Sequence, residues 1–208
     1  MSFAYSVSAY NRRRKWNIFL SEIRPTSELY ILDAGFSENE YSETDNFIEK
    51  YYPYPRMLTA LGIDYPNKFK IRYPEVTAIN YDGNVFPFDD KSFDVCWSNA
   101  VIEHVGDQEK QLFFLKEIKR VSKKAFVTTP NKYFPIEPHT RTPLLHYLPK
   151  AVFDGYLSTI GKSWATGNYM KLLSCTDLKG LLSSANITNY KIHKNKLGGF
   201  TLDFVIIF

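Results

Sequence analysis

Acidic residues close three of the apolar runs in this chain, and carboxylates in such places can bind the hydroxyl and amino groups of a small polar ligand. Asp33, Asp64 and Asp82 each stand in or directly after a short run of apolar residues. A carboxylate accepts two hydroxyl hydrogen bonds at once, which is what a ribose diol requires. If the three runs are strands of one parallel sheet, the three side chains lie on the same rim of that sheet.

Two histidines are the candidates for proton transfer. His139 lies in the proline-rich segment 130–149, and His104 follows the apolar run that ends at Ser98 and Asn99. A neutral imidazole near pH 7 can take the proton of a hydroxyl group, and this contributes ~10²–10⁴-fold where a reaction needs that step. For His139 the alternative is a histidine that only holds its loop through a hydrogen bond.

Metal ligands are not indicated by the spacing of histidines and cysteines. The four histidines occur singly along the chain, and Cys96 and Cys175 are far apart. Neither a metal-binding nor a redox motif contains them. We therefore expect two buried thiols and no metal site.

The elements that hold these residues alternate between strands and helices. Short apolar runs predict strands, and apolar residues spaced three and four positions apart predict helices. Strands are expected at 30–35, 57–64, 76–81, 93–97 and 125–129, helices at 9–23, 47–51, 108–123 and 174–185, and a closing hairpin at 189–193 and 200–208. The basic, aromatic segment 67–74 is expected to cover a sheet edge. The alternation is typical of an open α/β sheet, whose ligands bind outside the carboxyl ends of the strands.

One stretch has a more specific signature. Residues 82–105 begin with Asp82 and Gly83, pass through Phe-Pro-Phe and Asp-Asp-Lys-Ser, and reach Ser98 and Asn99 before Glu-His-Val. This run resembles the central motif of the class I S-adenosylmethionine-dependent methyltransferases, which shows an Asp, a Leu-Pro-Phe-like turn, Ser-Phe-Asp-Val and a small-residue turn into a Glu-His-Val-like helix. The resemblance implies a Rossmann-like, doubly wound, seven-stranded and mostly parallel sheet with a C-terminal antiparallel hairpin.

The resemblance assigns the first loop to the cofactor S-adenosylmethionine. The family pattern there is Asp-x-Gly-x-Gly-x-Gly, and this chain reads Asp-Ala-Gly-Phe-Ser-Glu-Asn from Asp33 to Asn39. It implies that Asp33 orders the loop or reaches the methionyl amine, that Gly35 gives the backbone clearance, and that Phe36 and Ser37 lie at the cofactor. Only the first of the three glycines is present, although serine and asparagine can still form such a loop.

The other strand ends complete the implied cofactor site. Asp64 is the candidate for the ribose diol, and Asp82 with Gly83 for the adenine. Asn99 and Ala100 are expected on the same rim, after the fourth strand.

The segment 130–170 is the expected acceptor-binding insertion. Its polar side chains Glu137, Arg141 and His146 could orient a polar acceptor, and by resemblance His104 points near the methyl-donor end. A long, proline-punctuated loop on the ligand rim is where acceptor recognition is expected.

Length favours a single α/β domain over 1–208. The resemblance implies that this is a methyltransferase domain, with residues 1–28 as an N-terminal helical segment. Hydrophobic residues make up 44% of the 208 residues, and the formal net charge is +4. This charge is too mild to indicate nucleic acid, and no apolar run approaches the ~18 residues of a membrane helix. We expect a cytoplasmic enzyme that acts on a small-molecule, glycan-linked or lipid-linked acceptor; its oligomeric state is not indicated.

Three alternatives follow from the same residues. A nicotinamide-dependent oxidoreductase needs a second glycine where this chain has Ser37, and a nucleic-acid amino-methyltransferase needs an Asn/Asp-Pro-Pro-Tyr-like clamp where it has Ser-Asn-Ala-Val from Ser98. The third alternative is a catalytically silent member of the family that binds a ligand or a partner enzyme. The glycine-poor first loop is the feature that favours it.

Overall fold

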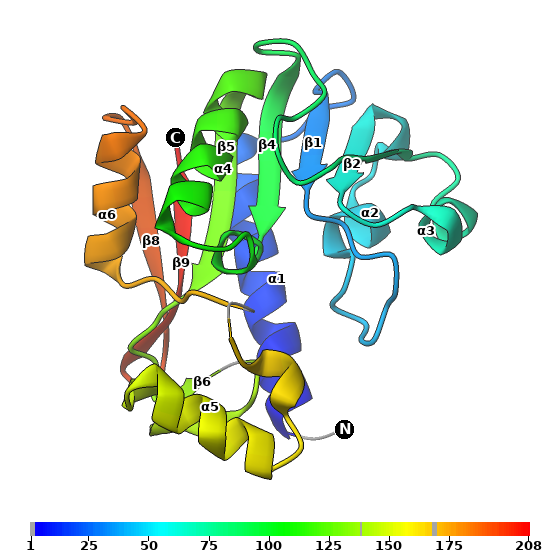
Figure 1. The fold of residues 1–208 in the computed structure, drawn as a ribbon. Helices are drawn as coiled ribbons and strands as arrows, with labels where there is room; N and C mark the ends of the chain where they lie inside the picture. The colour runs from blue at the N-terminus through cyan, green and yellow to red at the C-terminus, as the bar shows by residue number, and fades with distance from the viewer. Residues whose placement is uncertain (1–2, 138, 168–169) are drawn as a thin grey trace. The chain divides into compact units, whose positions relative to one another are not determined.

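A seven-stranded sheet organises the chain (Figure 1). The computed structural model describes residues 3–137, 139–167 and 170–208. The strands of the sheet lie in the order β3 (Thr77–Asn80), β2 (Leu58–Gly62), β1 (Ile31–Ala34), β4 (Phe93–Asn99), β5 (Ser122–Pro130), β9 (Phe200–Ile207) and β8 (Lys191–Leu197). A separate two-stranded sheet pairs β6 (Ile136–Glu137) with β7 (Thr142–Pro143). This confirms the predicted Rossmann-like sheet with antiparallel C-terminal strands.

The chain divides into two compact units, and each is described by itself. The first comprises residues 1–99 and 117–127, and the second comprises residues 100–116 and 128–208. The division falls inside one helix, α4 (Gln108–Val121), and inside one strand, β5 (Ser122–Pro130).

The first unit contains four parallel strands with the helices that follow them. Its elements are α1 (Phe3–Ile23), β1 (Ile31–Ala34), α2 (Phe47–Tyr51), η1 (Pro55–Met57), β2 (Leu58–Gly62), α3 (Asn67–Arg72), β3 (Thr77–Asn80) and β4 (Phe93–Asn99). The parallel register places Asp33 of β1 opposite Ala60 of β2 and Trp97 of β4. Strand β2 in turn pairs Gly62 with Asn80 of β3. The ends of these strands therefore lie next to one another, as a ligand rim requires.

Aromatic side chains bind α1 to the face of this sheet. The rings of Trp97 and Phe126 are stacked with their centroids 5.0 Å apart, and Phe19 of α1 meets both rings edge-on. Trp16, one turn earlier, contacts Trp97 and also Phe47 of α2. Aromatic pairs in these geometries add to the free energy gained by burying their area. The register of α1 on the sheet is thereby fixed, and Figure 1 shows this helix running along β4.

The second unit contains the C-terminal hairpin and the helical part of the predicted insertion. Its elements are η2 (Ile102–His104), β6 (Ile136–Glu137), β7 (Thr142–Pro143), η3 (Leu145–Tyr147), α5 (Lys150–Thr159), η4 (Ser163–Ala165), α6 (Cys175–Ser184), β8 (Lys191–Leu197) and β9 (Phe200–Ile207). Ser174 caps α6 in a capping box with Asp177. Ser174 is therefore the N-cap of the helix that was expected at 174–185.

Several elements differ from the sequence expectation. Residues 67–72 form the helix α3, where only an edge-covering segment was expected, and α5 was not anticipated at all. The hairpin is longer than predicted, because β8 continues to Leu197 and only the two glycines that follow it turn the chain. In the predicted segments 1–28 and 130–170, residues 1–2, 138 and 168–169 lie outside the described residues. No helix among the described residues is both long and apolar enough to span a bilayer.

Candidate cofactor and acceptor sites

Asp33, the residue proposed to order the first loop, is buried against a second carboxyl group. Asp33 is 5% exposed, and Glu49 of α2, which lies beside it, is 6% exposed. Burial raises the pKa of Asp33 to about 6 although Glu49 and Arg12 lower it. Burial and the neighbouring Asp33 raise the pKa of Glu49 well above its usual range. The two groups therefore share a proton near neutral pH.

Apart from the proton shared with Asp33, neither carboxylate oxygen of Glu49 receives a hydrogen bond from the described residues. A buried carboxylate without donors is costly, and a cationic ligand group placed there would satisfy it. An amine, such as the methionyl amine of the cofactor implied by the sequence, fits this pair. Glu49 was not predicted as a site residue. The signal that could have identified it is an acidic residue next to the apolar Phe47 and Ile48, where a buried position is expected.

The loop after β1 depends on Gly35 for its conformation. Gly35 has a φ of +128°, a value that side chains disfavour, and its N–H donates to the Leu61 carbonyl at 2.9 Å. The next residue, Phe36, is buried, and its ring lies against Phe69 of α3 with centroids 4.5 Å apart. The Phe36 side chain thus packs in the core of the unit, so only its backbone is placed to meet a ligand.

Gly62, at the end of β2, provides the space for the Phe36 ring. A Cβ atom at residue 62 would lie 2.6 Å from Cε1 of Phe36. We expect Gly62→Ala to destabilise the protein by about 1–3 kcal/mol, because the added methyl group overpacks a core contact. Gly155→Ala is the matched control, since nothing lies within 4 Å of a Cβ there and alanine favours its helix. Urea unfolding measures both variants, and equal stabilities would contradict the packing described for Phe36.

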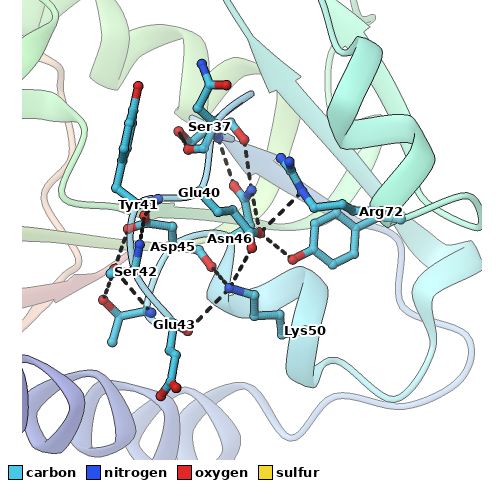
Figure 2. A network of polar contacts seen from close by, with 12 residues as sticks. Ser37, Glu40, Tyr41, Ser42, Glu43, Asp45, Asn46, Lys50 and Arg72 are labelled. Atoms are coloured by element: carbon cyan, nitrogen blue, oxygen red, sulfur yellow. Dashed lines mark hydrogen bonds and ion pairs between the residues drawn. The ribbon is translucent and has the colours of Figure 1, made fainter. Parts of the chain in front are cut away.

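A network of side chains holds the rest of the first loop where the family has glycines (Figure 2). Asn46 has a φ of +46°, and its side-chain oxygen accepts a hydrogen bond from the Ser37 N–H at 2.8 Å. Its side-chain NH₂ group donates to the Ser37 carbonyl and to the Glu40 carboxylate. Glu40 also pairs with Lys50 at 3.0 Å and with Arg72 at 3.8 Å. The loop is thereby tied to α2 and α3 by side-chain contacts. This accounts for an ordered loop in spite of Ser37 and Asn39 in the second and third glycine positions.

Asp64 and Asp82 follow neighbouring strand ends. The Tyr81 N–H donates to the Gly62 carbonyl at 3.0 Å, and the Asn80 side chain donates to the Ile63 carbonyl at 2.8 Å. These bonds join the chain after β2 to the chain after β3. Both aspartates are exposed, as is Gly83 beside Asp82. The structure thus brings Asp64 and Asp82 to adjacent positions on the rim, whereas Asp33 is buried at the end of β1.

The carboxylate of Asp82 is held by its own turn. It accepts hydrogen bonds from the backbone N–H and the side-chain amide of Asn84 at 3.0 and 2.9 Å. These bonds lower the pKa of Asp82. The group is therefore charged at neutral pH and can accept further hydrogen bonds from a ligand.

Asn99 and Ala100 end β4 in the predicted turn. Ala100 has a φ of +58°, which is unusual for a residue other than glycine, and its N–H donates to the Thr128 carbonyl at 3.0 Å. The Asn99 side-chain oxygen accepts from Lys15 of α1 at 3.5 Å. Lys15 is 5% exposed although it ends the basic run Arg-Arg-Arg-Lys, and such runs usually face solvent. The sequence missed this residue because its burial depends on contacts made only in the fold.

In the second unit, Glu137 orients His139. The Glu137 carboxylate accepts from Nδ1 and the backbone N–H of His139 at 2.8 and 3.0 Å, and from the Thr140 N–H and hydroxyl at 2.5 and 2.6 Å. Burial would raise the pKa of Glu137, but the bonds from His139 and Thr140 outweigh it and lower the pKa to about 2. Nδ1 of His139 therefore carries a proton, and Nε2 is the ring nitrogen that lies toward His104.

His104 meets His139 through this second nitrogen. The two Nε2 atoms lie 3.0 Å apart, and the rings are nearly perpendicular at 89°. Oε1 of Glu103 lies 4.0 Å from Nε2 of His139. The two histidines predicted from the sequence are therefore in direct contact, while Glu103 was not predicted to join them.

A cavity of about 630 Å³ lies beside Glu137 in the same unit. Both ring nitrogens of His146 are buried there and make no hydrogen bond within the described part of the chain. The wall contains three lysines and a set of apolar and aromatic residues: Lys132, Lys150, Lys171, Tyr133, Tyr147, Leu148, Phe153, Ala165, Met170 and Leu172. Of the residues expected to orient an acceptor, the cavity includes Glu137 and His146, but Arg141 is not among its lining residues.

Comparison with known proteins agrees with this architecture. The family model described as "Methyltransferase domain" matches residues 50–125, from the end of α2 to the first residues of β5. The chain has the class I methyltransferase fold. The resemblance of the central motif to the class I S-adenosylmethionine-dependent methyltransferases is thereby confirmed.

Solved structures of methyltransferases are similar at low sequence identity. A SAM-dependent methyltransferase from Aquifex aeolicus has a TM-score of 0.52 at 14% identity, covering 86% of this chain and 80% of that chain. One from Methanosarcina mazei has a TM-score of 0.52 at 18% identity, covering 90% and 95%. The Burkholderia thailandensis 1,6-didemethyltoxoflavin-N1-methyltransferase, with bound 1,6-didemethyltoxoflavin and S-adenosylhomocysteine, has a TM-score of 0.59 at 12% identity, covering 94% and 76%. No curated protein matches this methyltransferase-fold chain by sequence.

Proposed function

We propose that the protein is an S-adenosylmethionine-dependent methyltransferase that methylates a hydroxyl group of a small-molecule, glycan-linked or lipid-linked acceptor. The observation that carries this proposal is the set of carboxylates at the ends of β1, β2 and β3 in a methyltransferase fold. The buried carboxyl group of Asp33 and the exposed carboxylates of Asp64 and Asp82 can accept hydrogen bonds from three different parts of a ligand, and they lie at adjacent strands.

In this proposal each carboxylate binds a different group of the cofactor. The Asp33–Glu49 pair takes the methionyl amine, because both carboxyl groups are buried and no cationic side chain of the described residues donates to Glu49. Asp64 takes the ribose hydroxyls, and Asp82 with Gly83 takes the adenine amino group. Gly35, Phe36, Ser37, Asn99 and Ala100 contribute backbone or rim contacts. When bound, the cofactor supplies a methyl group on a positively charged sulfur.

His139 and His104 are assigned to the acceptor. Transfer to a hydroxyl oxygen forms an O–CH₃ bond and breaks the S–CH₃ bond, and the hydroxyl proton has to leave the oxygen. A group that lowers the cost of losing this proton accelerates the step. The Nε2 atoms of the two histidines are the polar atoms with this capacity, and Glu137 keeps His139 in the required tautomer.

The cavity beside Glu137 is the proposed acceptor pocket. Its three lysines favour an acceptor that carries negative charge, and its aromatic wall favours an apolar or ring-shaped body. A phosphate that links a sugar or a lipid combines both properties. Lys150 is partly neutralised by Asp154 at 2.8 Å, so Lys132 and Lys171 are the cations we assign to this charge.

Calorimetric titration with S-adenosylhomocysteine tests the cofactor assignment. We expect binding by the wild type and an affinity lower by about 1–3 kcal/mol for Asp64→Ala, because two charged hydrogen bonds to the ribose are lost. Asp89→Ala, which removes another exposed carboxylate, is the control and should bind as the wild type does. Absence of heat or of a thermal shift at millimolar ligand would refute the enzyme proposal, and an unchanged affinity of Asp64→Ala would remove that residue from the site.

A catalytically silent protein that binds a ligand or a partner enzyme is the second candidate. The feature that favours it is the first loop, where Phe36 fills the core and side chains stand in for two glycines. A protein of this kind would show no binding of S-adenosylhomocysteine in the same titration.

A further inference from the structure

We propose that Glu103, His104 and His139 bind a divalent transition-metal ion. Their potential ligand atoms are one carboxylate oxygen and two imidazole nitrogens, all within 4.8 Å of one another. The Nε2 atoms are 3.0 Å apart, and Oε1 of Glu103 is 4.0 Å from Nε2 of His139. Ligands at about 2.0–2.1 Å from a tetrahedral ion lie about 3.3 Å from each other, so the observed separations bracket those of a metal site.

Glu103 is the strongest argument for a cation. Its side chain is fully buried, and its Oε2 accepts from the Thr129 hydroxyl at 3.0 Å. Its Oε1 accepts no hydrogen bond from the described residues. A buried carboxylate oxygen without a donor is costly, and a bound cation between Glu103 and the two imidazoles would supply the missing partner.

The contacts around the three residues match those that orient metal ligands. A ligand histidine usually donates its second ring N–H to a carboxylate, which fixes the tautomer and aims the lone pair at the metal. Nδ1 of His139 makes this contact with Glu137 at 2.8 Å. The Thr129 hydroxyl serves the carboxylate ligand Glu103 in the same way.

The backbone around η2 fixes the position of the other two ligands. The buried amide of Gln111 donates to the Ile102 and Lys171 carbonyls at 3.1 and 2.9 Å, and the Lys171 N–H donates to the Glu103 carbonyl at 2.7 Å. These bonds fasten the turn that carries Glu103 and His104. The His139 side chain is 20% exposed, which leaves a direction open for water or an acceptor oxygen.

Two imidazoles and one carboxylate with an open position are typical of catalytic zinc and of non-haem iron sites. Such an ion lowers the pKa of an oxygen ligand, so it would perform the activation assigned above to the two histidines. The inference goes beyond the proposed function, because metal binding requires neither the cofactor nor the acceptor. A single proton shared between two imidazoles would also give an Nε2–Nε2 distance of 3.0 Å, and the experiment separates these cases.

The test uses protein without a polyhistidine tag, stripped with EDTA and dialysed. Zn²⁺ is titrated by calorimetry, and the metal retained after dialysis is counted by mass spectrometry. We expect one equivalent with a dissociation constant of about 1 µM or tighter. His104→Gln and Glu103→Gln should each weaken binding by at least ~100-fold, and Glu137→Gln by ~10–100-fold. His193→Gln, a histidine on β8, is the control and should leave binding unchanged.

The outcomes are distinguishable from those of the cofactor titration. No retained Zn²⁺, or equal Zn²⁺ affinity in wild type and His104→Gln, would overturn the metal site. Far-ultraviolet circular dichroism and the affinity for S-adenosylhomocysteine check that each variant is folded, since both are measured without Zn²⁺. As a second measurement on the wild type, Co²⁺ should give the visible absorption of a nitrogen- and oxygen-coordinated ion, and a spectrum of hydrated Co²⁺ would refute the site.

Discussion

Replacing His139 by alanine is expected to lower the turnover of methyl transfer by about 10²–10⁴-fold, which is the usual contribution of a group that assists proton loss from a hydroxyl. The affinity for S-adenosylhomocysteine should not change, because the cofactor is assigned to the carboxylates of Asp33, Asp64 and Asp82, whereas His139 is assigned to the acceptor. Transfer of label from methyl-tritiated S-adenosylmethionine to an extract of small molecules and lipids measures turnover. Calorimetry measures the affinity.

His193→Ala is the matched control for His139→Ala. His193 is also a histidine of the second unit but lies on β8, outside the contact between His104 and His139. Its turnover should equal that of the wild type. Normal turnover by His139→Ala would exclude this residue from the chemistry, whether it acts through a proton or through a bound metal ion.

The sequence predicted those helices and strands whose apolar residues recur at regular spacing and form one buried face. The helix expected at 108–123 is α4 at Gln108–Val121, where Leu115, Ile118 and Val121 are fully or almost fully buried. The strand expected at 93–97 is the core of β4. Where one face of an element is buried, the period of its apolar residues records that burial, so such elements can be recognised without the fold.

Elements and pairings that depend on distant residues were not predictable in the same way. Segment 67–72 is a helix whose only buried residue is Phe69, so its sequence has no amphipathic period to recognise. Glu103 and His139 are separated by more than thirty residues, and no metal-ligand spacing connects them. His139 lies between β6 and β7, outside any helix or strand, so its proximity to Glu103 is a property of the fold rather than of a motif.

The Asp33–Glu49 pair is the clearest case of a long-range contact with a measurable consequence. Each carboxyl group is almost fully buried, and the charged form of each is disfavoured by that burial. The pKa of Asp33 is about 6 in the folded protein and 3.8 ordinarily. The folded state therefore binds the proton more tightly than the unfolded state over this interval.

We expect the free energy of unfolding to fall as the pH rises from about 4 to above 6. The shift of Asp33 from 3.8 to about 6 corresponds to about 3 kcal/mol that is present at low pH and lost above both values. The raised pKa of Glu49 extends the loss to higher pH. Glu49→Gln should remove much of this loss of stability at high pH, because a neutral amide can donate a hydrogen bond to the Asp33 carboxylate. Urea unfolding of both proteins between pH 4 and pH 8 measures the difference.

At pH 8 the Glu49→Gln variant should be the more stable protein, and at pH 4 the two should be nearly equal, since a protonated Glu49 resembles glutamine. Glu43→Gln removes an exposed carboxylate from the loop that leads into α2 and should leave the pH dependence as it is in the wild type. A Glu49→Gln profile parallel to that of the wild type would show that Glu49 stays charged and separately solvated. In that case the pair could not hold a shared proton, and the amine assigned to it in the cofactor site would lose its strongest support.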